Sequence, residues 1–230
     1  MSEAGGVGTG PGTITNDGCA VEVYAGLPPR SEVDVIQRLV QPGGSVLDLG
    51  AGTGRMADPL ARSGLEVVAV DDSAEMLAHV QRAEPLLAGI ETLRLDRRFD
   101  VVLLASHLVN TSDDRQRQRF LETAAHHLAP TGTVAIEWHP PEWFDGLTPG
   151  ARTHGSVDAF EVELQVHEVR DGLVDATVSY RRGDDEWTQR FQARRLSHRD
   201  LDTTLRRAGL RWDAYLTEDH SWVGARPADD

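Results

Sequence analysis

The segments that constrain this chain most are Val46-Leu-Asp-Leu-Gly-Ala-Gly-Thr-Gly-Arg55 and Leu65-Glu-Val-Val-Ala-Val-Asp71. They predict a buried strand, a glycine loop, a helix, and a second buried strand that ends in an acid. The glycines at positions 50, 52 and 54 let the backbone turn tightly and approach a ligand where a side chain would stand in the way. This order of elements is typical of a pocket for a nucleotide-like cofactor.

Two details of the glycine loop indicate which cofactor. The dinucleotide pattern G-x-G-x-x-G needs its third glycine at position 55, where this chain has Arg55. Asp48, two residues before the first glycine, would repel a pyrophosphate but can face an ammonium, directly or through water or backbone groups. An oxidoreductase of the NAD type is therefore disfavoured.

The loop resembles motif I of the class I S-adenosylmethionine (SAM)-dependent methyltransferases. The resemblance rests on Asp48-Leu-Gly-Ala-Gly-Thr-Gly54, on Asp71, and on the helix start Asp72-Ser-Ala-Glu-Met-Leu77. In that family the acid at the position of Asp71 binds the ribose, and its spacing of about twenty residues from the loop suits a carboxylate that accepts two hydroxyls. The resemblance implies SAM as cofactor and S-adenosylhomocysteine as product.

The resemblance also implies a set of cofactor contacts. Asp48 would face the methionine ammonium, the main chain around Ala51 would cradle the methionine part, and Asp71 would hold the ribose. The family often has an acid after its third strand; this chain has Gly89 there, so Ile90 would lie against the adenine and backbone groups would read it. The expected cofactor-binding residues are Tyr24, Asp48, Gly50, Ala51, Gly52, Gly54, Asp71, Asp72, Met76, Gly89, Ile90, Ala105 and Ser106.

Strand and helix patterns alternate along the first part of the chain. Ser73 can cap a helix that runs to about Arg82, and the continuous apolar run Phe99–Ala105 is typical of a central parallel strand. After residue 156 the pattern changes to strict alternation of apolar and polar residues, which predicts antiparallel strands. We expect an α/β, doubly wound, mostly parallel seven-stranded Rossmann-like sheet with an antiparallel last strand, plus an inserted antiparallel β segment.

The same patterns suggest how the chain is divided. Residues 1–18 are small and polar and predict a flexible tail, and residues 19–230 fit one domain. The insertion, at about 145–196, would form a lid or an interface. It resembles the insertion of the N,N-dimethyltransferases of deoxysugar nucleotides, which implies a part in the acceptor site and a homodimer.

Composition excludes several classes of function. The net charge of −14 argues against a nucleic-acid substrate, and no apolar run is long enough for a membrane span. No lysine occurs, which excludes a Schiff-base enzyme and a Walker-type phosphate loop. The single Cys19 rules out an intramolecular disulfide and favours a cytoplasmic location, and the absence of zinc-like spacing predicts no metal.

The acceptor site should lie beyond the carboxyl ends of the parallel strands. His107 and His139 follow two of these strands and are the candidate general bases, although each could simply be hydrogen-bonded at a loop edge. We therefore expect SAM-dependent methyl transfer to oxygen or nitrogen of a small organic acceptor. The alternatives are a SAM-binding enzyme that does not methylate, for example a cyclase, and a non-catalytic SAM-binding module.

Overall fold

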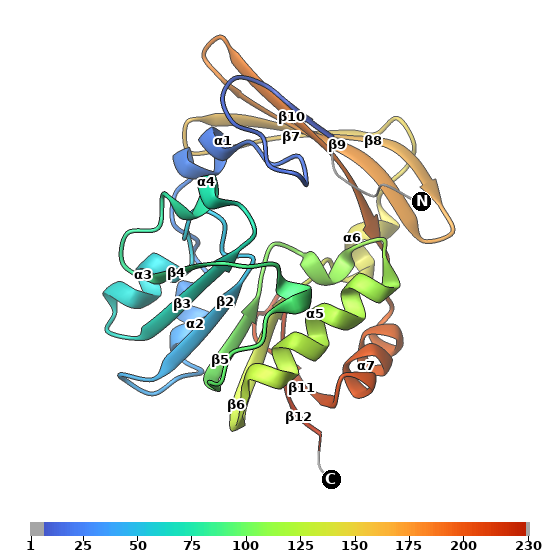
Figure 1. The fold of residues 1–230 in the computed structure, drawn as a ribbon. Helices are drawn as coiled ribbons and strands as arrows, with labels where there is room; N and C mark the ends of the chain where they lie inside the picture. The colour runs from blue at the N-terminus through green and yellow to red at the C-terminus, as the bar shows by residue number, and fades with distance from the viewer. Residues whose placement is uncertain (1–6, 229–230) are drawn as a thin grey trace.

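The computed structural model describes residues 7–228, which form two β-sheets and their connecting helices (Figure 1). The larger sheet has seven strands in the order β11-β12-β6-β5-β2-β3-β4. Its strands are β2 (Ser45–Leu49), β3 (Glu66–Asp71), β4 (Glu84–Leu87), β5 (Phe99–Leu104), β6 (Leu128–Glu137), β11 (Leu210–Tyr215) and β12 (Trp222–Pro227). From β4 to β6 the neighbours are parallel, whereas β12 is antiparallel to both β6 and β11. This confirms the predicted Rossmann-like sheet.

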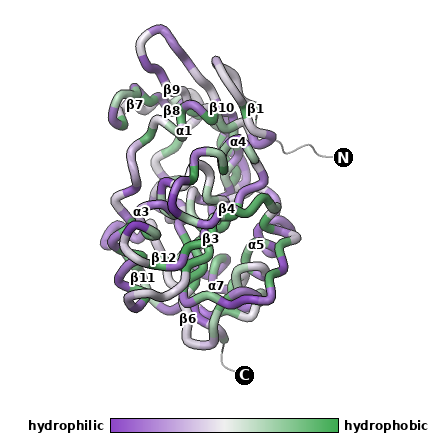
Figure 2. Tube along the Cα trace, turned by 60° about the vertical axis from the view of Figure 1, so that its left-hand side comes forward, coloured by the Kyte–Doolittle hydropathy of each residue, from purple (hydrophilic) through white to green (hydrophobic). Residues whose placement is uncertain are grey.

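Helices cover both faces of this sheet. The helices are α1 (Val21–Gly26), α2 (Val33–Gln37), α3 (Ala57–Arg62), α4 (Ala74–Leu77), α5 (Asp114–His127), α6 (Pro141–Asp145) and α7 (His198–Arg207), with 3-10 turns η1 (Ile90–Thr92) and η2 (Leu108–Asn110). Alternate residues of the central strands point into two separate cores, one shared with α5 and α7 and the other with α2 and α3. Both cores consist of buried hydrophobic side chains, and Figure 2 shows the middle of this sheet as hydrophobic. The sheet is therefore doubly wound, as predicted. Within residues 7–228, no helix combines the length and the apolar character needed to cross a bilayer.

Helix α4 is much shorter than the sequence pattern predicts. Ser73 caps it as expected by accepting from the backbone N–H of Met76, but the helix ends at Leu77 rather than near Arg82. The buried carboxylate of Asp58 accepts hydrogen bonds from the backbone N–H groups of residues 81–83. Because a side chain accepts from these N–H groups, the segment does not need the backbone hydrogen bonds that a longer helix would give it.

The second sheet lies above the carboxyl ends of the parallel strands (Figure 1). Its order is β1-β10-β9-β8-β7, and every neighbouring pair is antiparallel. The strands are β1 (Val7–Thr9), β7 (Arg152–Val157), β8 (Phe160–Arg170), β9 (Leu173–Arg182) and β10 (Asp185–Arg194). The antiparallel strands expected after residue 156 are present.

Strand β1 differs from the expected tail over residues 1–18. Residues 1–6 lie outside the described residues, but Val7–Thr9 pairs with the edge of β10 and so forms a strand. The indole N–H of Trp187 donates to the carbonyl of Pro11 at 2.8 Å, which holds the following turn on the same sheet. A three-residue strand that pairs only with a distant partner has too little periodicity to be recognised from the sequence.

Candidate functional site

The glycine loop between β2 and α3 has the backbone that its sequence predicts. Gly50, Gly52 and Gly54 all have positive φ values of 76°, 55° and 81°. The N–H groups of Gly50 and Ala51 donate to the carbonyl of Val70 at 2.9 and 2.8 Å, which fixes the loop against β3. No atom lies within 4 Å of a Cβ built on Gly52, so the loop faces open space there.

Asp48 lies beneath this loop and is 1% exposed. Neither of its carboxylate oxygens has a hydrogen-bond partner among the described residues. Burial and then the neighbouring charge of Asp71 raise the pKa of Asp48 to about 7, and the positive charge of Arg30 opposes that rise. A buried carboxylate without a partner is costly, and a cation placed beside it would remove that cost.

Asp71 ends β3 beside the loop, as predicted. Its Oδ2 accepts from the N–H of Gly52 at 2.8 Å and its Oδ1 from the N–H of Ser73 at 3.0 Å. Burial raises the pKa of Asp71, and these two hydrogen bonds oppose the rise. Asp72 is exposed and Met76 is buried, both at the start of α4.

Ile90 and Leu108 both lie close to Gly50 of the loop. A Cβ on Gly50 would come within 2.8 Å of Leu108 Cδ1 and 3.6 Å of Ile90 Cδ1. Gly89 is half-buried just before Ile90. The sequence pattern indicates Gly89 and Ile90 but not Leu108, because a leucine one residue after His107 carries no chemical signal of its own.

Helix α1 contacts the glycine loop. The hydroxyl of Thr53 donates to the carbonyl of Tyr24 at 3.0 Å. Burial raises the pKa of the Tyr24 phenol well above its ordinary value, and the neighbouring charges of Cys19 and Tyr180 add to the rise. Tyr180 belongs to β9, so Tyr24 lies between the glycine loop and the second sheet.

The turn after β5 is strained. Ala105 is buried, and the next two residues, Ser106 and His107, have left-handed φ values of 56° and 55°. This conformation is uncommon for residues other than glycine and is concentrated at functional sites. The N–H of Ser106 donates to Oε2 of the buried Glu137 at 2.6 Å, which holds the turn in place.

Glu137 is the centre of a buried charge network that the sequence analysis did not find. Its other oxygen, Oε1, pairs with the guanidinium of Arg30 and lies 3.6 Å from Nε2 of His107. Arg30 also pairs with Glu32 at 3.4 Å. Arg30 and Glu137 are 107 residues apart, and no local pattern signals their contact.

Three rings form a column beside this network. His107 stacks on His139 with ring centroids 3.6 Å apart, and His139 stacks on Trp143 with centroids 3.9 Å apart. Burial and then the charge of Arg30 lower the pKa of His107 to about 4, and burial and then His107 lower the pKa of His139 to about 3. Both imidazoles are therefore neutral at pH 7.

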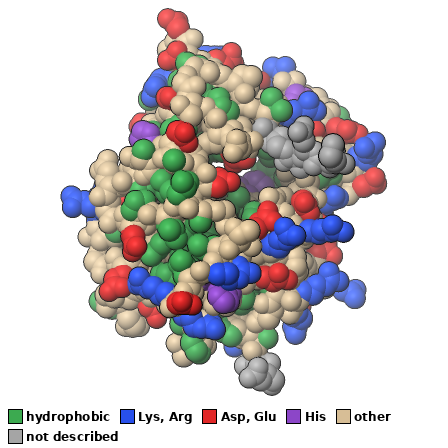
Figure 3. Space-filling view, viewed as in Figure 1, with side chains coloured by type: hydrophobic (Ala, Val, Ile, Leu, Met, Phe, Trp, Pro, Cys, Tyr) green, Lys and Arg blue, Asp and Glu red, His purple; other side chains and the backbone are tan. Residues whose placement is uncertain are grey.

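The column remains accessible to a ligand. The His107 side chain keeps 34% of its surface exposed, and Trp143 is half-buried. Figure 3 shows an opening between the second sheet and the parallel-sheet body, with histidine and acidic side chains at its edge. Within residues 7–228, no three His, Cys, Asp or Glu side chains are grouped so that they could hold a metal ion.

Comparison with known proteins supports the methyltransferase resemblance. Residues 46–132 match a family model described as a methyltransferase domain. An uncharacterised methyltransferase of Mycobacterium tuberculosis is 35% identical over 130 residues, covering 53% of this chain and 51% of the relative. The dTDP-3-amino-3,6-dideoxy-alpha-D-glucopyranose N,N-dimethyltransferase of Streptomyces fradiae is 33% identical over 131 residues, covering 54% and 50%. The chain thus spans about half the length of these curated relatives.

Similarity in fold extends over more of the chain than similarity in sequence. The CcbJ methyltransferase of Streptomyces caelestis superposes with a TM-score of 0.75 at 22% identity, covering 91% of this chain and 96% of that one. Residues 46–132 therefore resemble the methyltransferase domain family, and the chain has the fold of solved methyltransferases such as CcbJ.

Proposed function

We propose that this protein transfers a methyl group from SAM to a nitrogen or oxygen of a small organic acceptor. The observation that carries the proposal is the unpartnered carboxylate of Asp48, buried beneath a glycine loop that faces open space. The α-ammonium of SAM would supply the cation that this carboxylate lacks. The carboxylate of Asp71 would accept the ribose hydroxyls once it gives up part of its hold on Gly52.

The loop is poorly suited to a dinucleotide. Asp48 would repel a pyrophosphate placed above the loop. At the position of the third dinucleotide glycine, Arg55 extends toward α1, and its Nε donates to the carbonyl of Pro28 at 2.8 Å. Its side chain is thus part of the packing around the loop, where the dinucleotide pattern needs a glycine for close helix packing.

The ring column is the proposed acceptor side. SAM, when bound, supplies an electrophilic methyl group bonded to its sulfonium sulfur, and this sulfur becomes the thioether of the leaving product when the methyl group is transferred. The acceptor N–H or O–H loses its proton as the new bond to carbon forms, and a neutral imidazole of His107 or His139 accepts it. Glu137, 3.6 Å from Nε2 of His107, stabilises the imidazolium that results. The rings position the acceptor and the second sheet excludes water, and these two effects supply the rest of the rate acceleration.

Among acceptors, we favour an amine on a small molecule. The Streptomyces fradiae relative is named for N,N-dimethylation of an amino sugar, although it shares only about half its length with this chain. The flat faces of His139 and Trp143 offer a surface against which a sugar ring or an aliphatic amine can pack. The acidic net charge makes a nucleic-acid acceptor unfavourable.

Calorimetric titration with SAM, S-adenosylhomocysteine and NAD tests the cofactor. We expect both sulfur ligands to bind with dissociation constants on the order of micromolar, and NAD not to bind. Asp71→Ala should abolish this binding, whereas Asp96→Ala, which removes an exposed acid outside the site, should leave it unchanged. Binding of NAD alone would contradict the cofactor assignment.

An acceptor screen tests the reaction. Amino sugars, nucleotide-linked amino sugars and simple amines are incubated with SAM, and both S-adenosylhomocysteine and the methylated mass are measured. Both products together support methyl transfer. A changed acceptor with SAM unconsumed would indicate a SAM-binding enzyme of another kind, and SAM binding without turnover of any acceptor would indicate a binding module.

We infer a cytoplasmic location and a homodimer as secondary proposals. The lone Cys19, a free thiol, supports a reducing compartment. Strand β7 is exposed at all six residues and forms a free edge of the second sheet, which supports pairing with a second copy. Light scattering after size-exclusion chromatography tests the second point, and a monomer across the micromolar range would refute it.

A further inference from the structure

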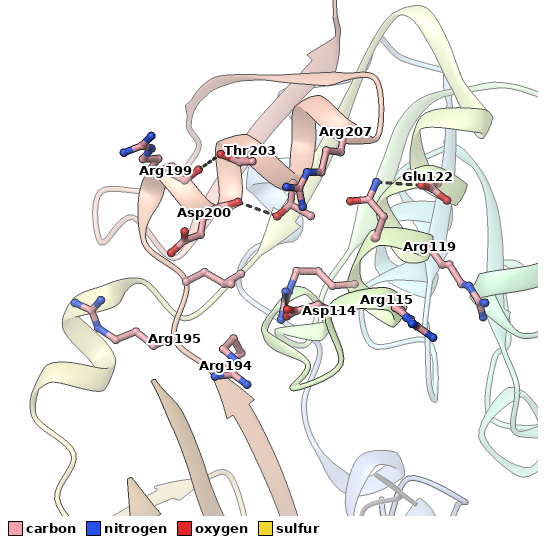
Figure 4. Close-up of a pocket in the computed structure, with 14 residues that line it drawn as sticks. Asp114, Arg115, Arg119, Glu122, Arg194, Arg195, Arg199, Asp200, Thr203 and Arg207 are labelled. Atoms are coloured by element: carbon pink, nitrogen blue, oxygen red, sulfur yellow. Dashed lines mark hydrogen bonds and ion pairs between the residues drawn. The ribbon is translucent and has the colours of Figure 1, made fainter. Parts of the chain in front are cut away.

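A groove with a volume of about 980 Å³ lies between α5 and α7, and its lining includes no residue of the glycine loop or of the ring column. Figure 4 shows its lining side chains coming from the two helices and from the end of β10. Seven arginines and three acidic residues line it: Arg115, Arg117, Arg119, Arg194, Arg195, Arg199, Arg207, Asp114, Glu122 and Asp200. No sequence motif assigns a function to these arginines.

The positive charge of the groove is only partly neutralised. Three of the arginines pair with carboxylates: Arg117 with Asp114 at 2.7 Å, Arg119 with Glu91 at 2.8 Å, and Arg195 with Asp145 at 2.9 Å. The other four, Arg115, Arg194, Arg199 and Arg207, form no ion pair within residues 7–228. In a chain with a net charge of −14, this is a concentrated region of positive charge.

The remaining acids of the groove are already engaged. The carboxylate of Asp200 caps α7 by accepting from the N–H and the hydroxyl of Ser197 at 2.9 and 2.7 Å. Glu122 accepts from the side-chain amide of Gln118 at 3.1 Å. Neither of these two acids forms an ion pair with a groove arginine, so within the groove only Asp114 pairs directly with an arginine.

The floor of the groove is held by hydrogen bonds to buried residues. Arg117 is 3% exposed, and its Nε donates to the carbonyl of Val109 at 2.7 Å while another nitrogen donates to that of Thr111. Asn110 donates to the carbonyl of Arg194 at 3.0 Å and accepts from the N–H of His139 at 2.8 Å. The buried Asn110 therefore joins the groove directly to the ring column.

The arginines are spread along both rims rather than converging on one point. In Figure 4, Arg195 and Arg199 lie on the side of α7, and Arg115 and Arg119 extend from the side of α5. Figure 3 likewise shows Arg side chains distributed over the region of α5 and α7. A single phosphate could contact only one rim, whereas an extended series of carboxylates could contact both.

We propose that this groove binds an acidic segment of another protein. An acidic protein segment can confine its charge to the groove, whereas a nucleic acid carries its charge along its whole length and would meet the acidic remainder of the surface. The rim guanidiniums would pair with the partner's carboxylates, and Asn110 would place that partner beside the acceptor side. The proposal goes beyond the proposed function and does not depend on it.

Fluorescence anisotropy with the full chain and a fluorescein-labelled twelve-residue polyglutamate peptide tests the proposal. We expect saturable binding on the order of micromolar in about 50 mM NaCl, weakening steeply as salt is raised to about 300 mM. Arg115, Arg199 and Arg207 are exposed and carry no ion pair with described residues, so their joint change to Gln should not disturb the fold. This variant should bind about tenfold more weakly.

The control is a second triple change to Gln, at Arg38, Arg62 and Arg82. These arginines are also exposed, and the change alters the net charge equally. It should alter binding less than about twofold. Equal weakening by both variants, or no binding in about 50 mM NaCl, would overturn the proposal. So would tighter binding of a twelve-nucleotide single-stranded DNA through the same arginines, or displacement of the peptide by about 1 mM phosphate.

Discussion

His107 and His139 stack face to face, with ring centroids 3.6 Å apart and planes inclined by only 16°. They follow β5 and β6, which are parallel neighbours, so the carboxyl ends of these strands bring the two rings together. Two imidazolium ions at this separation would repel each other strongly in a partly buried site. The stacking and the lowered pKa values of about 4 and 3 therefore indicate the same state, two neutral bases at pH 7.

Changing either ring to Gln should lower kcat for methyl transfer about a hundredfold to ten-thousandfold if that ring is the base. Because both pKa values lie near 4 or below, the wild-type kcat should show no acidic limb from these groups between pH 5 and 7. His126→Gln, on the exposed side of α5, is the matched control and should leave kcat unchanged. A kcat within about threefold of wild type in both site variants would remove the histidines from the proton-transfer role.

Acid should destabilise the protein partly through His107. Its folded pKa lies below its ordinary value of 6.5, so the unfolded chain binds the proton first. The stability that depends on a neutral ring is present above pH 6.5 and is lost as the pH falls from 6.5 through about 4. Thermal unfolding of wild type and His107→Gln at pH 7.5 and 5.0 checks this. The drop in Tm between the two pH values should be smaller in the variant, and equal drops would refute the assignment.

Binding of SAM should release a proton from Asp48. Its pKa is about 7 in the free protein, and an adjacent ammonium would favour the ionised form. The affinity for SAM should therefore rise between about pH 6 and 7.5. Asp48→Asn should weaken binding about tenfold to a hundredfold and abolish this dependence. Calorimetry in two buffers of different ionisation enthalpy measures the proton release directly, and a release that persists in the variant must come from another group.

Two buried aspartates should respond oppositely to the same substitution. Asp48 has no hydrogen-bond partner among the described residues, and its pKa is raised from 3.8 to about 7, so the cost of ionising it in the folded protein grows as the pH rises from 3.8 to about 7 and is complete above that. Asp48→Asn should therefore stabilise the free protein at pH 8, by up to about 4 kcal/mol. Asp58 accepts four hydrogen bonds from backbone donors, so Asp58→Asn should destabilise it by about 1–3 kcal/mol. Urea unfolding measures both, and changes of the same sign would contradict this account.

The features that the sequence predicted correctly are those encoded locally. The glycine loop, the acid that ends β3 and the alternating strands of the second sheet each occupy a short segment whose residue types specify its conformation. The order of the parallel strands follows from these segments because the connections are short and right-handed. The fold could therefore be predicted almost completely.

What the sequence did not reveal depends on contacts between distant residues. The end of α4 is set by Asp58, more than twenty residues earlier, and β1 exists only because β10 offers a free edge. His107 and His139 were named as separate candidates, yet their stacking with Trp143 depends on the exact exit angles of two strands. Arg30 carried no signal because an arginine after two prolines is an ordinary surface residue.

The ion pair between Arg30 and Glu137 should be energetically coupled and should matter for catalysis through the turn that it supports. Glu137→Gln leaves a largely buried guanidinium without its carboxylate and should cost about 3 kcal/mol of stability, as should Arg30→Gln. The double variant should lose clearly less stability than the sum of the losses in the two single variants, because the second change removes a group already left unpaired.

Glu137→Gln keeps an oxygen for the N–H of Ser106, whereas Glu137→Leu does not. The Leu variant alone should therefore release the left-handed turn at Ser106 and His107, raising KM for the acceptor while SAM affinity stays within about threefold. Equal KM values for the two variants would show that the hydrogen bond to Ser106 does not position the column.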